Sequence, residues 1–565
     1  MSPFANRSPR RGSMLSSETI LKRGALTLVL LVVVLAVFAT KFTSLDVNGA
    51  DYAQIARNVA TGHGYTTSVL SPLSLAVVPR TENHPELTRP PAYVTVLALA
   101  MIVGGASDKT VVVVSLIFFL LSALALYFVA RRCFGSRVAL WSALLYSLSV
   151  PVLRQAISGL DTTFLCFLVT LLFGVLLWNY RAPHPGDEDE GDEPSSYGMA
   201  IPIAAGVLLG LCYMTSYDTL VLLPVVLYFL WRSDRPQFKR HLVLTLVPFL
   251  VLVLPWIIRC SIAAGGPFIS LHGYELAMFT DQYPGQTLFG RFADIPHKPW
   301  LMLITHWSDM VKKIGQGFGG LYTDAAQFAG PYLMPFFIVG LFLSGPRRRW
   351  TLLHGCLGLV ILLQVIVLCF YQSLGRLLLP YAPLVAAVAV YWFVTLVEEW
   401  NEALVDRRRS RHRPSKSRDW LAYLGLMVAG GIPLVLFMFL SGASQPPPVI
   451  DTMKQLATMP YPYVATDLPW LAAWYGEKQA LALPFRDLDW KAMEQVGLTP
   501  PAVYLSSALV GPPPYERYAS WQFHGMTSLP NWHGDGLLLA KTAATSGGPP
   551  AVSATPGAPR PPAAP

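Results

Sequence analysis

The chain has 565 residues, of which 53% are hydrophobic and 13% are charged, whereas about 25% are charged in a typical soluble protein. Its net charge of +9 does not indicate nucleic-acid binding, because the basic residues cluster in short connections between long apolar runs. Apolar runs of about 17 to 25 residues, the length that crosses a bilayer as a helix, recur from Gly24 to about Ser441. The composition therefore predicts an α-helical polytopic membrane protein.

Eleven membrane-spanning helices are expected from these runs. The first, 24–44, follows a basic tail, is too long for a signal peptide and lacks a clear cleavage site, so we expect an uncleaved anchor with a cytoplasmic amino terminus. The next six are expected near 110–130, 138–154, 162–180, 198–215, 219–231 and 242–258. One more ends at "GPRRRW", two precede "DRRRSRHRPSKSR" and the last runs near 420–441. The strongly basic connections all fall on one side, which predicts a multi-pass protein of the cell membrane with an extracytoplasmic carboxyl terminus.

Four units follow from this pattern. They are a basic cytoplasmic tail (1–23), a transmembrane domain (24–444) with outside loops 45–108 and 259–327, a small extracytoplasmic α/β module (445–543), and a disordered Pro/Ala-rich tail (544–565). An acidic connection, "GDEDEGDEPSS", is also expected to be disordered and to lie in the cytoplasm.

The long loop 259–327 and the module are the two units whose roles stay open. The loop carries Trp300 and Trp307, and it is expected either to cover a cavity or to form an interfacial belt. In the module, strand-like runs such as "YPYVATD" and "PAVYLSS" alternate with helix-like "PWLAAWYG" and "LDWKAMEQVG", and Asp467 is expected to cap a helix. Acceptor recognition and packing against the outside loops are both compatible with this pattern.

The six cysteines lie in or beside apolar runs, so we interpret them as small buried residues and not as a disulfide framework or a metal site.

The stretch "DYAQIARNVATGHGY" predicts a short helix along the outer membrane surface. Its apolar positions repeat at helical spacing: Tyr52, Ile55, Ala56 and Val59. Asp51 precedes the first of them and Gln54 follows three residues later, which resembles a capping box, and Gly62 is expected to end the helix. At about three turns it is too short to cross the membrane.

Charged residues at the outer ends of the expected spans are predicted to share one cavity. They are Asp46, Asp51, Arg89, Asp161, Asp218, Arg259 and Arg376. A transporter more typically carries its ionisable groups near the bilayer midplane on broken helices, and this chain shows little of that pattern. We therefore expect chemistry at the membrane interface.

The order of several motifs resembles the polyprenyl-phosphate-sugar-dependent membrane glycosyltransferases of the GT-C superfamily, in particular the protein O-mannosyltransferase and aminoarabinose-transferase branch. These motifs are "DYAQIARNVATGHGYTT", "TRPPAYVTVLALA", a span ending "ARRCFG", and "GLDTTF". Later, "LPWIIRCSIAAGGPF" and "GRLLLPYAPLVA" are similar to further motifs of these proteins. The likeness runs through about residues 40 to 400.

The resemblance implies inverting transfer of a sugar from a polyprenyl phosphate-linked donor to a protein, lipid or glycan acceptor. It also implies an aspartate in the first outside loop as general base or acceptor-orienting group. In many relatives this acid stands four residues before Tyr52, where this chain has Asn48. Asp51 matches a second acidic position of some members, and Asp46 would substitute only if the loop shifts by two residues. We favour Asp51, because a carboxylate near a helix amino terminus stays ionised.

The resemblance assigns two further site residues, and position adds a third. Asp161 matches the acid at the outer end of the fourth span, although it is also placed to cap that span. Arg89 matches the basic residue before a Pro-Pro pair that is thought to meet the lipid phosphate. Arg376 lies at the outer start of the tenth span, where its planar fork suits phosphate. Snorkelling toward lipid headgroups is the alternative for both arginines.

Four residues are candidates for substrate contacts: Tyr52, His63, Asp218 and Arg259. The alternatives are an exposed turn for His63, a helix cap for Asp218, and snorkelling or loop-pinning for Arg259. No cofactor is evident; some GT-C enzymes use a divalent metal, but the spacing of acidic residues does not indicate one here. The expected partners are the donor, the acceptor and membrane lipids, without nucleic acid. A polyprenyl-lipid flippase or transporter, or a catalytically altered GT-C homologue, is the alternative function.

Overall fold

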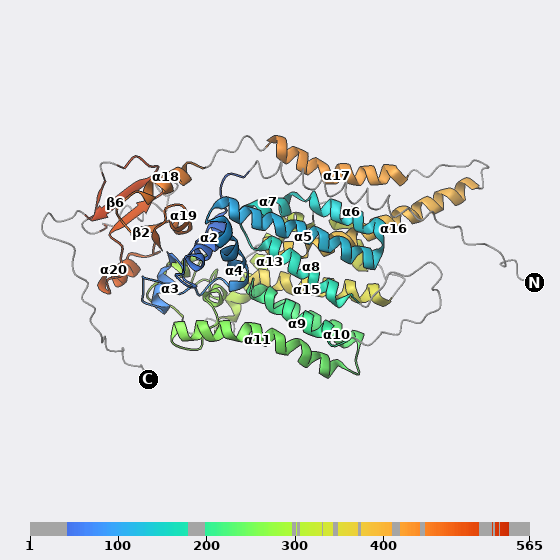
Figure 1. Cartoon of the computed structure of the whole chain (residues 1–565), viewed down its shortest axis with the longest axis horizontal. Helices are drawn as coiled ribbons and strands as arrows, with labels where there is room; N and C mark the ends of the chain where they lie inside the picture. Colours follow the sequence, from blue (N-terminus) through green and yellow to red (C-terminus); the bar gives the residue numbers. More distant parts are fainter. Residues whose placement is uncertain are drawn as a thin grey trace, which may run out of the picture.

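The computed structural model describes residues 42–178, 198–296, 301, 305–329, 332–342, 348–370, 375–409, 419–440, 447–507, 523, 526–529 and 532–541. Within them, long helices form a bundle beside a small α/β unit, and the first loop lies between the two (Figure 1). The basic tail, nearly all of the first expected span, the acidic connection and the Pro/Ala-rich tail lie outside the described residues.

The bundle helices occur where apolar spans were expected. They are α5 (Asp108–Phe134), α6 (Ser136–Ser147), α7 (Val150–Ser158), α8 (Thr162–Leu176), α9 (Ala200–Tyr213), α10 (Leu222–Ser233), α11 (Phe238–Ala264), α14 (Met334–Phe342), α15 (Arg348–Phe370), α16 (Ala382–Arg409) and α17 (Asp419–Leu440). Among the described residues, the segments Asp108–Phe134, Phe238–Ala264 and Arg376–Trp400 are long and apolar enough to cross a membrane, and α6 with α7 makes a fourth if this pair, bent by 58°, is one span. Other apolar helices are shorter, so eleven spans stay a prediction.

Small residues let the bundle helices approach closely. A Cβ added at Gly206 of α9 would lie 2.2 Å from the carbonyl oxygen of Thr245 on α11, so only glycine fits this crossing. The opposite side of α11 carries exposed apolar side chains, including Val251 and Ile258. Close packing through small residues on one face and apolar exposure on the other is typical of helices in a bilayer.

The first loop forms helix α2 (Val47–Ala60), strand β1 (Val69–Leu70), helix α3 (Pro72–Val77) and helix α4 (Pro91–Gly104). The predicted cap was wrong, because α2 begins at Val47 and Asp46 is its N-cap, with the Asp46 side chain accepting from the Asn48 N–H. Asp51 therefore lies in the second turn of the helix, where it is buried and has no capping role. The apolar helix α4 was not predicted.

Gly49 determines how closely α2 approaches the turn before α8. The Asp46 N–H donates to the carbonyl of Ser158 at 3.0 Å, and a Cβ added at Gly49 would lie 2.1 Å from the same oxygen. Gly49 lies one turn before Tyr52 on α2, and the Ser158 turn leads directly to Asp161. The glycine thus brings these two side chains together.

Replacing Gly49 with alanine is expected to destabilise the protein by about 1–3 kcal/mol or more, because the methyl group must displace backbone. The Tyr52 hydroxyl should also move away from its partner Asp161. The measurement is the thermal unfolding midpoint of the detergent-purified variant. Gly315→Ala is the control, because its Cβ would meet nothing within 4 Å. Equal midpoints for the two variants would contradict the close approach.

The α/β unit contains a six-stranded sheet in the order β1-β3-β2-β4-β6-β5. Its strands beyond β1 are β2 (Tyr463–Thr466), β3 (Gln479–Ala482), β4 (Ala502–Leu505), β5 (Met526–Ser528) and β6 (Leu537–Lys541). Strands β1 to β4 pair in parallel and β4, β6 and β5 pair antiparallel. Its helices are α18 (Pro448–Ala457), α19 (Pro469–Trp474) and α20 (Asp487–Gln495). Strand β1 comes from the first loop, so the sheet joins two segments about 400 residues apart.

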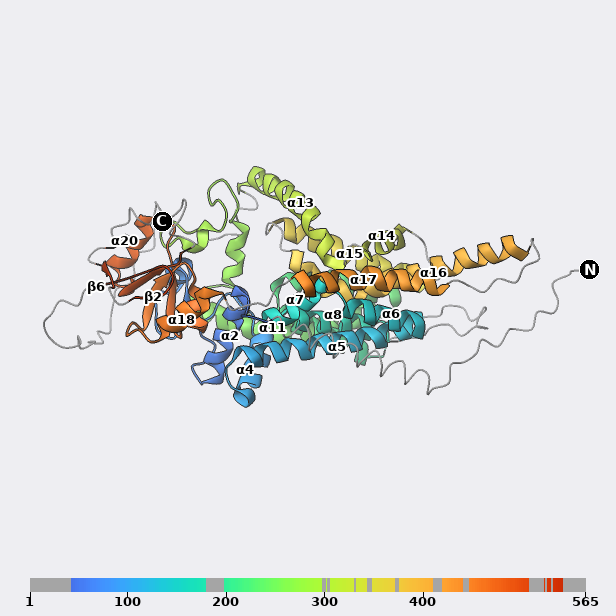
Figure 2. The ribbon, with the colours of Figure 1, turned by 90° about the horizontal axis from the view of Figure 1, so that it is seen from above.

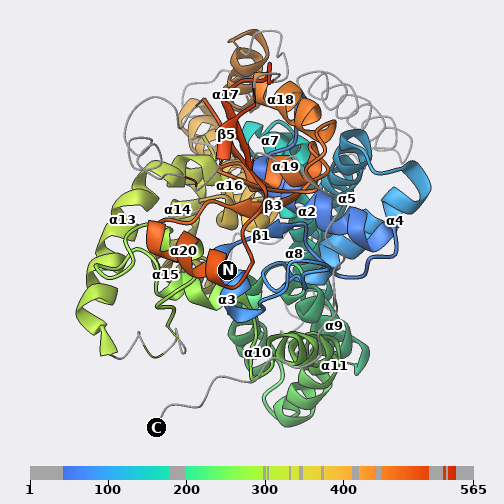
Figure 3. The same ribbon diagram turned by 90° about the vertical axis from the view of Figure 1, so that its left-hand side faces the viewer.

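Hydrogen bonds tie the α/β unit to the first loop. Arg57 of α2 donates to the carbonyls of Ala473 and Trp474 at 2.6 and 3.1 Å, and the Trp474 indole donates to Asp108 at 2.7 Å. Asp467 does not cap α19 as predicted, because its carboxylate accepts from the N–H and hydroxyl of Ser506. The unit therefore packs against the loop that carries the candidate site (Figure 3).

The second long loop also reaches the α/β unit. It contains η2 (Leu271–Leu276), η3 (Thr287–Gly290) and α13 (Trp307–Ala329). The carboxylate of Asp489 accepts from the N–H groups of Phe292 and Ala293 and from the Arg486 guanidinium. Helix α13 extends along one side of the molecule, with Trp307 exposed (Figure 2), whereas Trp300 lies outside the described residues.

Candidate functional site

A cavity of about 760 Å³ lies where the first loop, η2, η3 and the α/β unit meet the end of the bundle. Its volume is in the range of small-molecule sites, about 300–1,000 Å³. The ionisable side chains that line it are Asp51, Tyr52, His84, Glu86, Arg89, Asp161, Tyr217, Asp218, His272, Glu275 and Arg376. Asp51, Arg89, Asp161 and Arg376, which the sequence singled out, are thus brought together.

Arg89 connects two neighbouring polar residues of α2. Its Nε donates to Asp51 Oδ2 at 2.8 Å, and a terminal nitrogen donates to Asn48 Oδ1 at 2.8 Å. The other carboxylate oxygen of Asp51 accepts from Gln54 at 3.2 Å. Asn48, the position that carries the acid in many relatives, therefore faces the same guanidinium as Asp51.

Tyr52 and Asp161 form the second polar contact of the cavity. The Tyr52 hydroxyl donates to Asp161 Oδ2 at 3.1 Å, and the Arg89 guanidinium lies 4.8 Å above the Tyr52 ring. Asp161 stands at the N-cap position of α8 but makes no capping hydrogen bond with its side chain. Burial raises the pKa of Asp161, and the positive charges of Arg376 and Arg89 oppose this shift. The carboxylate is therefore directed to the cavity and not to its own helix.

Arg376 precedes α16, in η5 (Gly375–Tyr381), and lines the cavity. Its Nε is buried and has no hydrogen-bond partner among the described residues. Arg376 and Arg89 both line the cavity, and a guanidinium has five N–H donors, so these two residues give the cavity groups that suit an anionic ligand.

Glu86 is a site residue that sequence reasoning missed. Its Oε1 accepts from the backbone N–H groups of Thr88 and Arg89, at 2.5 and 2.8 Å. Burial, together with the negative charge of Asp51, raises the pKa of Glu86 to about 7. Glu86 lies in a stretch without helical or strand periodicity, so no sequence pattern indicated that it belongs to the site.

This pKa shift predicts a pH-dependent stability. Between the ordinary glutamate value and about 7, the folded protein holds more protons on Glu86 than the unfolded chain does, so the free energy of unfolding falls as pH rises through this window. Glu86→Gln keeps an acceptor for the two N–H groups and removes the titration. We expect its unfolding midpoint to vary less between pH 5 and 7 than that of the parent protein. The exposed Glu82→Gln variant is the control, and parallel profiles for all three proteins would refute the shift.

Asp218, His272 and Glu275 form a second charged cluster in the cavity. His272 lies between the two carboxylates, with Nε2 3.4 Å from Asp218 Oδ1 and Nδ1 2.9 Å from Glu275 Oε1. Burial alone lowers the pKa of His272, but the two carboxylates outweigh it and raise the pKa to about 10. Asp218 therefore pairs with a histidine from the second long loop instead of capping a helix, and neither His272 nor Glu275 was predicted from the sequence.

Three sequence candidates are absent from the cavity lining. Asp46 and His63 are exposed, and the His63 Nδ1 lies 2.8 Å from the Thr61 hydroxyl in the same turn. Arg259 donates to the carbonyls of Tyr65 and Glu86. It therefore pins the first loop, which was one of the alternatives to a substrate contact.

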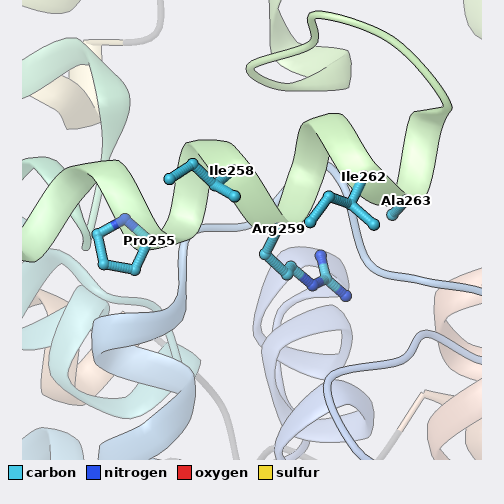
Figure 4. A pocket seen from close by; sticks show the side chains of 5 residues that line it. All are labelled: Pro255, Ile258, Arg259, Ile262 and Ala263. Atoms are coloured by element: carbon cyan, nitrogen blue, oxygen red, sulfur yellow. The ribbon is translucent and has the colours of Figure 1, made fainter.

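Arg259 also borders a separate groove of about 560 Å³ on α11. The lining residues are Pro255, Ile258, Arg259, Ile262 and Ala263. Figure 4 shows the Arg259 guanidinium directed from α11 toward the first loop. Among the described residues, no group of three or more His, Cys, Asp or Glu side chains could hold a metal ion.

The structure is similar to two solved membrane enzymes. One is the archaeal oligosaccharyltransferase AglB from Archaeoglobus fulgidus in complex with an inhibitory peptide and a dolichol-phosphate, with 13% identity and a TM-score of 0.56 over 93% of this chain and 75% of that one. The other is ArnT from Cupriavidus metallidurans bound to undecaprenyl phosphate, with 15% identity and a TM-score of 0.56 over 93% of this chain and 99% of that one. Apo ArnT matches with 14% identity and a TM-score of 0.54, over 94% and 99%.

Residues 88–258 match the model of a family described as dolichyl-phosphate-mannose-protein mannosyltransferase. No curated protein sequence matches the chain. The family match and the similar folds confirm the resemblance to GT-C polyprenyl-phosphate-dependent glycosyltransferases.

Proposed function

We propose that the protein transfers a sugar from a polyprenyl phosphate-linked donor to an acceptor, with inversion at the anomeric carbon. The observation that supports this best is the meeting of Asp51, Arg89, Asp161 and Arg376 in one cavity of a GT-C fold. Similar structures were solved with dolichol-phosphate and with undecaprenyl phosphate, which supports a polyprenyl phosphate as the donor carrier.

Arg89 and Arg376 hold the donor phosphate in this proposal. Arg89 uses Nε and one terminal nitrogen for Asp51 and Asn48, and the guanidinium has five N–H groups, so donors remain for phosphate oxygens. Arg376 lines the same cavity and contributes a second guanidinium to the phosphate oxygens. Positive groups placed where the leaving phosphate gains charge lower the barrier to transfer.

Asp51 is the general base, and Asp161 with Tyr52 positions the acceptor. Each carboxylate oxygen of Asp51 accepts one protein hydrogen bond, which leaves lone pairs for the acceptor proton. The acceptor oxygen forms a bond to the anomeric carbon as the bond from that carbon to the phosphate oxygen breaks. The polyprenyl phosphate leaves with the bonding electron pair, and the acceptor proton passes to Asp51.

We further propose that the cavity faces the extracytoplasmic side, with the amino terminus in the cytoplasm. The support is the alternation of basic connections along the chain. The eleven spans and the proposed unit boundaries depend on the same topology, so a test of the topology also tests them. Labelling of cysteines placed at the exposed positions Glu82 and Arg235 in intact cells tests it, since these residues lie on opposite sides in the proposal.

The test of function is a transfer assay with purified full-length protein in lipid nanodiscs. Polyprenyl phosphates carrying labelled mannose, glucose or aminoarabinose are incubated with mixed membrane acceptors, and the product is analysed by NMR. We expect labelled product with the anomeric configuration opposite to that of the donor. Retained configuration would contradict the displacement mechanism. Movement of intact donor across the bilayer, without transfer, would support a flippase.

A further inference from the structure

Helix α13 supports two elements of the cavity without lining the cavity itself. None of its described side chains is among the lining residues. Its buried Lys313 donates from Nζ to the carbonyls of Glu275 and Leu276, at 3.0 and 3.1 Å. These carbonyls belong to η2, which brings the side chains of His272 and Glu275 to the cavity. Lys313 therefore ties α13 to the second charged cluster.

Gly317 joins the same face of α13 to the bundle. A Cβ added at Gly317 would lie 2.6 Å from the Cα of Cys369, near the end of α15, so the two backbones are in direct contact. Because Lys313 and Gly317 are four residues apart, they lie on one face of the helix. Helix α13 also packs on η5, which carries Arg376. It is therefore attached to two elements that carry cavity residues, η2 and η5.

A second face of α13 exposes large apolar side chains. We define the apolar stripe by Trp307, Val311 and Phe318, which are 64%, 51% and 54% exposed. Separations of four and seven residues place these side chains on one side of the helix. Lys312 and Gln316 are exposed on another side. Helix α13 is thus amphipathic, and Figure 3 shows it at the edge of the molecule.

The apolar stripe adjoins an apolar surface of the bundle. Leu362 and Ile366 of α15 are 56% and 40% exposed. They precede Cys369 by seven and three residues, so they lie on the side of α15 that meets Gly317. Exposed apolar side chains on the helix bundle of a membrane protein face lipid, because lipid tails are as apolar as these side chains. The stripe is therefore next to a lipid-facing surface.

Two further features favour the bilayer as the partner of the stripe. Tryptophan is enriched where a membrane meets water, and Trp307 stands at the start of α13. Helix α13 is not among the described segments that are long and apolar enough to cross a membrane, so a position along the membrane surface fits it. We propose that the apolar stripe binds the lipid bilayer at the cavity end of the bundle, and that α13 thereby anchors η2 and η5 at the membrane surface.

Spin labels measure the depth of α13 in the full-length protein in lipid nanodiscs. They are attached to Val311→Cys, Phe318→Cys and, as the matched control, Gln316→Cys. A Cys133→Ser background is used, because the other five native cysteines are buried. From collision rates with oxygen and a nickel chelate, we expect the first two labels about 5–10 Å into the headgroup and acyl boundary and the control label in water. Equal water accessibility at all three positions would overturn the proposal. Labels at 311 and 318 that another protein surface shields from both reagents would overturn it as well.

Lys313→Met tests the connection to η2, with a spin label at Gly273→Cys, where an added Cβ meets nothing within 4 Å. The variant removes two hydrogen bonds from η2, so we expect the label to become more mobile. Lys313→Arg should restore the ordered spectrum, and Lys312→Met, at an exposed lysine, should leave it unchanged. The same mobility in Lys313→Met as in the parent, or an equal gain in both methionine variants, would contradict the connection. Neither measurement needs a donor, so failure of sugar transfer would contradict the proposed function and leave the membrane contact of α13 standing.

Discussion

Replacing Asp51 with asparagine is expected to lower kcat for sugar transfer by about 10²–10⁴-fold, the usual effect of removing a general base. The substitution keeps the shape of the side chain and its hydrogen bond with Gln54, while the Arg89 Nε loses a charged partner. Because donor binding depends mainly on the arginines, KM for the donor should change little. Steady-state kinetics with the labelled donor measure both quantities.

Asp46→Asn is the matched control for this variant. Asp46 is exposed and caps α2 through a hydrogen bond that asparagine also makes, so its kcat should stay within a few-fold of the parent. A protein in which Asn48 and Asp51 are exchanged is a more stringent test, because both residues face Arg89 and the net charge is kept. We expect its kcat to lie between those of Asp51→Asn and the parent. Full activity in the Asp46→Asn, Asp51→Asn double variant would refute the assignment of Asp51 as the general base.

Replacing Arg89 with glutamine is expected to have the second large effect, a loss of about 10²–10³-fold in kcat/KM for the donor. Removing one group that stabilises developing negative charge typically has this size. The variant also leaves buried Asp51 without its ion pair, and breaking a buried pair costs about 3–5 kcal/mol. Transfer kinetics and the unfolding midpoint together separate the two consequences.

Arg89→Lys is the informative companion of that variant. Lysine keeps the positive charge but cannot bond Asp51 and Asn48 with one planar fork. We expect its kcat/KM to fall between those of the parent and the glutamine variant. Arg376→Gln should weaken the donor interaction without destabilising Asp51. Glutamine variants of both arginines with unaltered donor kinetics would contradict the phosphate site.

Periodicity and composition predicted the long bundle helices and several strands of the α/β unit, but not β1, α3 and α4 beside the site. The apolar runs that led to the span predictions coincide with α5 and α11, and the runs around Val464 and Val503 form strands β2 and β4. Hydrophobic pattern and local turn signals are sufficient for these elements, because they depend on neighbours close in sequence. The bend between α6 and α7 is an exception, since it interrupts one continuous apolar run.

The start of α2 could not be settled from sequence, because Asp46 and Asp51 both suit an N-cap. The contact that decides between them is long-range: the Asp46 N–H binds the carbonyl of Ser158, and Gly49 allows the approach. Once Asp46 caps the helix, Asp51 is available to Arg89. The sequence resemblance singled out Asp51 and Arg89 separately, but their direct pairing appears only in the fold.

The residues that sequence reasoning missed lie in segments without regular periodicity. Glu86 and His84 occupy the irregular stretch before α4, and His272 and Glu275 belong to the short η2. The pairing of His272 with Asp218 joins residues distant in sequence, and Glu86 is held by the backbone N–H groups of Thr88 and Arg89. Neither kind of contact leaves a spacing pattern in the sequence.

The central claim is that this cavity breaks the bond between a sugar and a polyprenyl phosphate and passes the sugar to an acceptor. The most direct measurement uses a donor labelled separately in the sugar and in the phosphate, with nanodisc-embedded protein. We expect sugar-labelled product and free polyprenyl phosphate to appear in a 1:1 ratio, and we expect Asp51→Asn to slow both equally. Donor that remains intact, or equal cleavage by the parent and the Asp51→Asn variant, would contradict it.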